Sequence, residues 1–390
     1  MMQKQSGKFG IYFHWPYCLN KCPYCDFNSY ADKAMLHDEI TKAYLSELDH
    51  VLENIKSNKL ESVYFGGGTP SLMKTENVAK ILSWIDSRYS LQTVEITLEV
   101  NPATVDFAKL VSLKNAGINR LSIGVQSFDD NNLSFLGRLH DSKGAKQAIT
   151  DARKAGFDNI SVDLILATKT STMETLENDL LEIDSYKPEH VSAYLLTIEP
   201  DTVFGKQSSA GHILTANESL SADQFDFCRK KLHELGYEHY EISNYAKANE
   251  RSRHNQLYWD GSEYISVGPG AHSYLHSEGK YGVRYGNLLK PEDYIDSIQN
   301  SGSAREFTEV LSSNEAVSDA IMTGLRRMDG IKESEFIART GKTFEAFPAK
   351  TLENLLRQNM ITLKNIDQDR VLSLSDKGIL FADDVILELF

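Results

Sequence analysis

Three cysteines stand close together near the start of the chain. They are Cys18, Cys22 and Cys25, in the spacing C-x3-C-x2-C. Thiolates are soft ligands that suit iron–sulfur clusters or zinc. Three thiolates can hold three irons of a [4Fe–4S] cluster and leave the fourth iron open to another ligand. The alternative is a zinc knuckle with His14 as fourth ligand, although structural zinc sites usually place two ligand pairs well apart.

The bulk properties of the chain exclude several classes of protein. It has 390 residues, with 41 Lys and Arg against 55 Asp and Glu, a net charge of −14. This acidic balance argues against nucleic acid as a partner. We find no apolar run of the about 20 residues that a membrane span needs, so we expect no stable membrane insertion. The first residues show no signal or transit pattern, and the clustered cysteines indicate metal binding in a reducing cytoplasm.

The first 250 residues alternate strand-like runs with amphipathic, helix-like stretches. This alternation predicts βαβ units and a mainly parallel sheet in an α/β fold. Six units are fewer than the eight of a closed barrel, so we predict a partial (β/α)6 barrel, with a doubly wound sheet as the alternative. A seventh segment, 237–245, follows a long helix. The six runs are 9–15, 61–66, 94–100, 120–126, 159–166 and 190–196.

The pattern changes near residue 290, where helices replace the alternation and a possible hairpin follows them. Helices followed by a small hairpin resemble a winged helix. This region has 12 Lys and Arg against 18 Asp and Glu, which favours a lid or a partner-docking domain over a DNA-binding one. We therefore predict a partial barrel over 1–245, a closing segment over 246–289 and a mostly helical, winged-helix-like domain over 290–390.

The cysteine motif, its place after the first strand and the βα alternation resemble the radical S-adenosylmethionine (SAM) superfamily. Further segments, in the same order, look like the branch that contains oxygen-independent coproporphyrinogen III dehydrogenase and its HemW-like haem-chaperone relatives. The resemblance covers nearly the whole chain. The segments are YFHWPYC at 12–18, YFGGGTP at 64–70, LEVNP at 98–102, GVQSF at 124–128, LGR at 136–138 and GPGAHS at 268–273.

The resemblance implies that SAM chelates the open iron and that an electron from the cluster cleaves it to a 5′-deoxyadenosyl radical. The glycines before Thr69 would let the backbone approach SAM closely, and Arg138 could bind a carboxylate with two hydrogen bonds. Asp163 lacks the Gly-Leu-Pro turn that usually follows it in the family, which bears on a contact with a second SAM. The implied SAM-binding residues are Tyr12, Gly67, Gly68, Thr69, Glu99, Gln126, Arg138 and Asp163.

Two departures separate the chain from the dehydrogenases. Those enzymes have a further cysteine two residues after the third, where this chain has Phe27, within the Asp26-Phe27-Asn28 run of the chaperone-like relatives. The chain also carries HNQLYW at 254–259, a motif of the chaperone branch that has been linked to haem. Imidazole ligates haem iron and aromatic rings stack on porphyrins, so we predict that His254 binds haem. The alternative is a structural histidine on a loop that closes the barrel.

These observations predict a cytoplasmic haem chaperone that binds a [4Fe–4S] cluster, SAM and haem. It would accept electrons from a donor protein and deliver haem to respiratory-chain acceptors. The alternative is oxygen-independent coproporphyrinogen III dehydrogenase, which decarboxylates a porphyrin precursor, so whether the chain is an enzyme stays open and we name no catalytic residue. A plain electron-transfer protein fits less well, because one iron is left open and the SAM motifs would have no use.

Overall fold

The computed structural model describes residues 7–390 apart from positions 32, 54, 56, 58 and 277. One sheet of 12 strands dominates it, in the order β12-β11-β10-β9-β1-β2-β3-β4-β5-β6-β8-β7. The strands from β9 to β6 in this order are parallel. They are β9 (Glu263–Val267), β1 (Lys8–Trp15), β2 (Lys59–Gly67), β3 (Glu95–Val100), β4 (Arg120–Gln126), β5 (Asn159–Leu166) and β6 (His190–Leu195).

The parallel sheet predicted from the six runs is confirmed, because those runs are β1 to β6. The segment 237–245 is not a further parallel strand. It forms an antiparallel hairpin of β7 (Glu238–Glu241) and β8 (Asn244–Ala246) beside β6. The other edge is extended by three antiparallel strands that the sequence analysis did not predict. They are β10 (His272–Leu275), β11 (Val283–Asn287) and β12 (Arg305–Val310).

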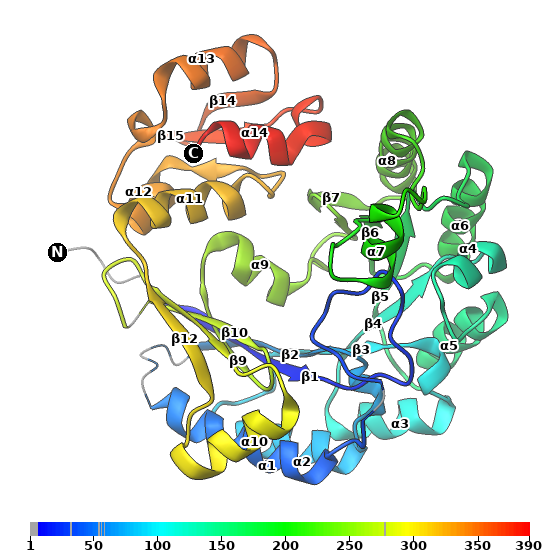
Figure 1. Cartoon of the computed structure of the whole chain (residues 1–390). Helices are drawn as coiled ribbons and strands as arrows, with labels where there is room; N and C mark the ends of the chain where they lie inside the picture. The colour runs from blue at the N-terminus through cyan, green and yellow to red at the C-terminus, as the bar shows by residue number, and fades with distance from the viewer. Residues whose placement is uncertain (1–6, 32, 54, 56, 58, 277) are drawn as a thin grey trace.

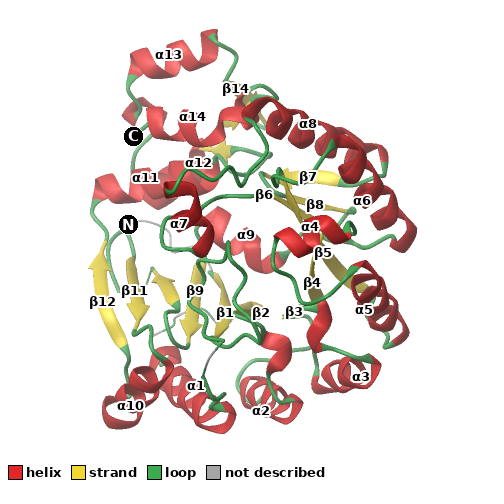
Figure 2. Cartoon of the chain, turned by 45° about the vertical axis from the view of Figure 1, so that its right-hand side comes forward, coloured by secondary structure: helices red, strands yellow, loops and turns green. Residues whose placement is uncertain are grey.

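The sheet is curved, with helices on its outer side (Figure 2). Alternation along β1 explains the two faces: Phe9, Ile11 and Phe13 are fully buried against the outer layer, while Tyr12 and His14 point into the curve. The inner face is therefore polar and the outer face apolar. The helices before the C-terminal region are α1 (His37–Leu52), α2 (Thr75–Asp86), α3 (Phe107–Ala116), α4 (Asp130–Phe135), α5 (Ser142–Lys154), α6 (Met173–Tyr186), α7 (Val203–Ser209), α8 (Glu218–Glu234), α9 (Arg253–Asp260) and α10 (Pro291–Ser301).

The C-terminal region has the predicted helices and hairpin. A three-stranded sheet, in the order β13-β15-β14, packs with helices around a core of its own that includes Phe336 and Leu372. Because β12 pairs with β11, the main sheet continues beyond residue 290, and the three-part division stays a prediction. The elements are α11 (Ser313–Gly324), β13 (Ile331–Lys332), α12 (Glu333–Thr340), α13 (Ala349–Arg357), β14 (Ile361–Ile366), β15 (Asp369–Leu374) and α14 (Ala382–Glu388), and short 3-10 turns lie at Pro70–Leu72, Pro102–Thr104, Phe344–Ala346 and Gly378–Phe381.

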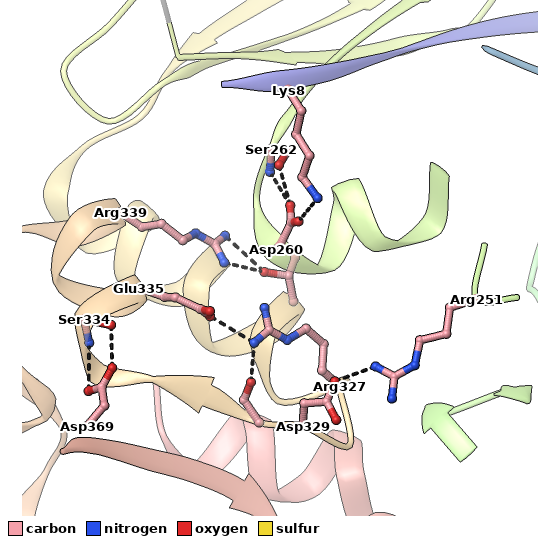
Figure 3. Close-up of polar contacts among 12 residues, drawn as sticks. Lys8, Arg251, Asp260, Ser262, Arg327, Asp329, Ser334, Glu335, Arg339 and Asp369 are labelled. Carbon is pink, nitrogen blue, oxygen red and sulfur yellow. Dashed lines mark hydrogen bonds and ion pairs between the residues drawn. The ribbon is translucent and has the colours of Figure 1, made fainter. Parts of the chain in front are cut away.

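The C-terminal region contacts both edges of the curved sheet, and α9 lies inside the curve (Figure 1). At the β7 edge, the backbone N–H of Met328 donates to the Tyr240 carbonyl at 3.0 Å. Near the other edge, Arg284 on β11 pairs with Asp319 on α11 at 3.2 Å. Figure 3 shows a further ion pair between the C-terminal region and the rest of the chain, formed by Asp329 and Arg251. None of the helices in the described part of the chain has the length and apolar character to cross a membrane.

Candidate cluster and cofactor site

The cysteines lie on the loop between β1 and α1, and this loop is fastened to itself. The backbone N–H of Cys18 donates to the Tyr30 carbonyl at 3.0 Å, and that of Tyr30 donates to the Pro16 carbonyl at 2.7 Å. A tight turn brings the N–H of Cys25 to the Cys22 carbonyl at 3.1 Å. The loop therefore follows the carboxyl end of β1, at the edge of a parallel sheet where such folds build their sites.

Two hydrogen-bond donors from distant segments point at the sulfurs. The Thr69 hydroxyl donates to Cys18 Sγ at 3.3 Å, and Arg138 Nη1 donates to Cys22 Sγ at 3.4 Å. Burial raises the pKa of Cys25 to about 11; the Cys22 and Cys18 thiols add to the rise, and a hydrogen bond from the Phe27 backbone opposes it. A thiol in this setting keeps its proton at pH 7 until a metal replaces it.

The glycines that end β2 allow the strand to pack directly against the cysteine loop. The N–H of Gly68 donates to the Trp15 carbonyl at 2.7 Å, and that of Thr69 donates to the Tyr17 carbonyl at 2.9 Å. A Cβ on Gly68 would lie 2.7 Å from the Tyr17 carbonyl oxygen and 3.1 Å from Cys18 Sγ. Any larger residue would push the loop away. Close approach of the loop is thus one reason for the glycine run, whatever ligand binds beside it.

Glu99 and two tyrosines lie on the inner face of the curved sheet, on the strands β1 to β3. Tyr64 donates its hydroxyl proton to Glu99 Oε1 at 2.9 Å, and the rings of Tyr12 and Tyr64 stack with centroids 6.0 Å apart. Burial raises the pKa of Glu99 to about 7, against the lowering effect of the Tyr64 hydrogen bond. Glu99 can therefore carry either charge state near neutral pH. Tyr64 was not predicted from the sequence, although it lies in the YFGGGTP segment at the spacing that faces it inward.

Asp163 on β5 is held by a serine of its own strand and by one of the neighbouring strand β4. Its carboxylate accepts hydrogen bonds from Ser122 at 2.9 Å and from Ser161 at 3.1 Å. Ala167 takes the left-handed backbone conformation (φ +58°) after this strand, and its N–H donates to the buried Gln224 side chain at 2.9 Å. The strand therefore ends in the kind of turn that glycine usually supplies, at a cost in backbone strain for alanine.

Gln126 ends β4, and Arg138, which follows α4, donates back to that strand. Gln126 has a φ of +70°, which marks the irregular end of that strand. Arg138 Nη2 donates to the Gly124 carbonyl at 2.9 Å, while Nη1 faces Cys22. Its buried Nε has no hydrogen-bond partner within the described residues. A guanidinium with a donor left over beside three thiols is suited to bind a ligand carboxylate.

His254 lies elsewhere, on α9, near the amino ends of β1 and β2. It is 1% exposed, its Nδ1 is hydrogen-bonded with Ser62 Oγ at 2.8 Å and its Nε2 with the Tyr258 hydroxyl at 2.9 Å. Burial lowers the pKa of His254 to about 3, so the ring is neutral. It stacks on Tyr64 at 4.8 Å, which links it to the Glu99 group but not to the cysteines. Ligation of a haem iron by His254 would break one of these two bonds, and that role stays a prediction.

The donor set around the cysteine loop fits a cluster better than a zinc knuckle. His14, the candidate fourth zinc ligand, has both ring nitrogens engaged, Nε2 by the Asn28 carbonyl at 2.8 Å and Nδ1 by the Tyr12 hydroxyl at 3.2 Å. Three thiols, with Thr69 and Arg138 donating to two of the sulfurs, fit a [4Fe–4S] cluster with an open iron that a second cofactor would complete. Throughout the described segments, no three His, Cys, Asp or Glu side chains converge on the position of a single metal ion, and this includes the three cysteines.

Comparisons with known proteins show which family the chain is similar to. The model of the Radical SAM superfamily matches residues 12–183, and that of the HemN C-terminal domain matches residues 311–381. The chain is 32% identical over 352 residues to heme chaperone HemW of Bacillus subtilis (strain 168), covering 90% of this chain and 92% of that protein. It is 33% identical over 374 residues to radical S-adenosyl methionine domain-containing protein 1, mitochondrial, of Danio rerio, covering 95% and 82%.

Among solved structures, the fold is similar to that of coproporphyrinogen III oxidase (HemN) from Escherichia coli, a radical SAM enzyme. The TM-score is 0.82 over 100% of this chain and 91% of that chain. At 18% sequence identity, this likeness shows the fold alone. The sequence relatives, which match along almost their full length, show the family. The chain therefore belongs to the radical SAM superfamily and, within it, to the family of the proteins named heme chaperone HemW.

Proposed function

We propose that this chain is a haem chaperone that holds a [4Fe–4S] cluster and SAM at the carboxyl end of its sheet and delivers haem to respiratory-chain acceptors. The single observation that carries the choice is Phe27. It stands where the resemblance places a further cysteine in the dehydrogenases, and its apolar side chain is 59% exposed. The names of the sequence relatives and the HNQLYW segment support the same choice.

Cys18, Cys22 and Cys25 would hold the cluster. When bound, the cluster and SAM supply reductive cleavage of SAM to a 5′-deoxyadenosyl radical, with an electron from a donor protein. Thr69 and Arg138 would stabilise the thiolates, because hydrogen bonds to cluster sulfurs withdraw electron density and raise the reduction potential. The SAM-binding set implied by the resemblance is Tyr12, Gly67, Gly68, Thr69, Glu99, Gln126, Arg138 and Asp163.

Within that set, Glu99 and Arg138 have the most specific chemistry. An ionised Glu99 would accept hydrogen bonds from the amine of SAM while Tyr64 keeps the carboxylate oriented. The unpartnered Nε of Arg138 would donate to a carboxylate. The amine of SAM would thus meet the Glu99 carboxylate, and the carboxylate of SAM would meet the Arg138 guanidinium. Such ion pairs are stronger in a partly buried site than in water.

For haem, we keep His254 as the proposed iron ligand, with Tyr258 and Trp259 as apolar contacts. This role requires α9 to loosen, because His254 is buried and hydrogen-bonded at both nitrogens. We also propose a cytoplasmic location, since thiolate ligands need a reducing compartment. The relative from Danio rerio is named as mitochondrial, and that location is a statement about that protein.

One experiment separates the chaperone from the dehydrogenase. Anaerobically reconstituted protein, with SAM and a reductant, is offered haem and coproporphyrinogen III in parallel samples. We expect a stable Soret band from bound haem and no formation of the divinyl product from coproporphyrinogen III. Robust conversion of coproporphyrinogen III would contradict the proposal and would indicate that the chain is a dehydrogenase.

A further inference from the structure

The turn Gly268-Pro269-Gly270, between β9 and β10, has no part in the proposed function, yet it lies against the exit of the cysteine loop. Asn28, three residues after Cys25, donates both amide protons to this neighbourhood: its Nδ2 lies 2.9 Å from the Pro269 carbonyl oxygen and 2.8 Å from that of Leu289. We propose that Asn28 is a positioning residue that straps the exit of the cysteine loop to this turn and so determines how firmly a cluster is retained.

The glycines of the turn are shaped to receive the loop. Gly270 has a φ of +72°, and a Cβ there would lie 2.7 Å from Asn28 Nδ2. Gly268 has a φ of +112°, and a Cβ there would lie 2.7 Å from the His14 carbonyl oxygen. Both positions therefore need glycine for conformation and for space. The turn therefore contacts His14, on the strand before the cysteines, and Asn28, which follows the cysteines.

The turn is itself hydrogen-bonded to a buried carboxyl group. Glu47 on α1 is 2% exposed and accepts hydrogen bonds from the Gly268 N–H at 3.2 Å, from Asn287 Nδ2 at 2.7 Å and from the Tyr294 hydroxyl at 2.6 Å. Tyr44, from the same helix, donates to the His14 carbonyl at 2.6 Å. Asn28 thus binds to a rigid support rather than to a mobile loop.

Asn28 is also held through its own backbone. Its carbonyl accepts from His14 Nε2 at 2.8 Å, which leaves His14 Nδ1 to accept from the Tyr12 hydroxyl at 3.2 Å. Burial lowers the pKa of His14 to about 4, so the ring keeps this neutral arrangement at pH 7. The preceding carbonyl, of Phe27, accepts from Lys21 Nζ at 2.9 Å. The side chain of Asn28 links this exit to the Pro269 carbonyl, and the Tyr30 hydroxyl adds a longer bond to the Leu289 carbonyl at 3.2 Å.

These contacts predict a specific defect when the strap is cut. The three thiols remain in the chain, so a cluster can still assemble. The exit of the loop, however, gains freedom near Cys25, and the cluster should be lost more readily. The inference rests on the proposed cluster and not on haem delivery.

The test compares two identical substitutions on the same loop. Asn28→Asp keeps the size of the side chain but replaces the donor by an oxygen that faces two carbonyls. Asn20→Asp is the matched control, because exposed Asn20 donates only one long hydrogen bond, to the Gly137 carbonyl at 3.5 Å. Each protein is reconstituted anaerobically, its iron and sulfide are measured, and cluster loss to an iron chelator is followed by visible absorption.

We expect Asn28→Asp to lose its cluster about tenfold faster than wild type, and Asn20→Asp to lose it at the wild-type rate. The electron paramagnetic resonance spectrum of the reduced cluster should change only in Asn28→Asp. If Asn28→Asp does not fold, Asn28→Ser, which is smaller and uncharged, takes its place in the same comparison. A wild-type rate of loss in the Asn28 variant, or an equal acceleration in Asn20→Asp, would overturn the strap. A wild type that takes up no iron and sulfide would overturn the proposed cluster and the strap together.

Discussion

The two ends of the parallel sheet differ in the chemistry that lies beside their unpaired polar groups. At the carboxyl end, Arg138 donates to Cys22 Sγ through Nη1, and among the described residues its Nε has no partner and Glu99 has Tyr64 as its side-chain partner. At the amino end, Trp259 Nε1 on α9 and Arg120 Nε are also buried without a hydrogen-bond partner among the described residues, but the start of α9 is capped. Glu95 accepts the N–H groups of Arg253 at 3.1 Å and of His254 at 3.2 Å, at the start of that helix.

Unpaired buried groups therefore lie at both ends, and the expected ligand depends on the chemistry beside them. At the carboxyl end, the unpaired donor belongs to the same guanidinium that donates to Cys22 Sγ. We expect the carboxyl end to take a cluster and SAM with the hydrogen bond between Tyr64 and Glu99 kept. At the amino end, His254 can ligate haem iron only by giving up one of its two hydrogen bonds.

The largest expected effect is at the carboxyl end. Cys22→Ser should abolish the broad visible absorption of a [4Fe–4S] cluster after anaerobic reconstitution, because serine is a poor substitute for a thiolate ligand. Cys228→Ala is the matched control, since Cys228 is fully buried on α8, away from the loop, and should leave the cluster intact. Full iron and sulfide in Cys22→Ser, or stoichiometric zinc in wild type, would contradict the cluster site.

The next effect concerns SAM. Glu99→Ala should leave the cluster loaded and weaken SAM binding about tenfold to a hundredfold, since a hydrogen bond to a charged group contributes roughly 1.5–3 kcal/mol. The pKa of Glu99 is raised to about 7, so the carboxylate forms as the pH rises through 7. Wild-type affinity for SAM should therefore fall from pH 8 to pH 6, and Glu99→Gln should lose this dependence. Isothermal titration that finds equal affinities would remove Glu99 from the site.

A smaller effect is expected at the amino end. If His254 ligates haem iron, His254→Ala should shift or remove the Soret band while cluster and SAM binding persist. Tyr258→Phe is the informative partner, because it removes only the hydroxyl bonded to His254 Nε2. That variant should bind haem about fivefold more tightly, since one competing hydrogen bond is gone. An unchanged Soret band in His254→Ala would make His254 a structural residue that holds α9 in place.

The smallest expected effect is on the pH dependence of stability, through Glu47, the buried side chain that is hydrogen-bonded to the Gly268 turn. Burial raises the pKa of Glu47 to about 7 from a usual 4.5, against hydrogen bonds from Tyr294, Asn287 and Gly268 that lower it. A raised pKa in the folded state stabilises the protein below pH 4.5, and this contribution disappears as the pH rises through 7. From pH 6 to pH 8, wild type should lose about 1 kcal/mol more unfolding free energy than Glu47→Gln. Parallel pH profiles in denaturant titrations would contradict this ionisation.

Much of the fold could be predicted because it depends on local patterns. The strands β1 to β6 and the C-terminal helices are short periodic segments with clear ends. The strand β9 was missed because its pairing with β1 joins residues more than 240 positions apart, and its five residues read as part of a loop. β12 was missed because half of its sequence, REFTEV, is charged and most of it is exposed.

The candidate site could be predicted where motifs fix it and not where distant contacts do. The cysteine spacing gave the loop its place after β1. The burial of His254 depends on Ser62, nearly 200 residues earlier, and on Tyr258 one helical turn later. The contact of Asn28 with Pro269 spans 241 positions. No local pattern contains such pairs, so only the folded chain shows them.

Transfer of haem tests the proposed function most directly. Protein reconstituted with its cluster and loaded with haem is mixed anaerobically with a haem-depleted respiratory cytochrome, and the Soret band of the acceptor is followed over time. The same haem carried on serum albumin serves as the reference. We expect the chain to fill the acceptor several times faster than albumin does, without converting coproporphyrinogen III. Transfer no faster than from albumin would contradict a chaperone function.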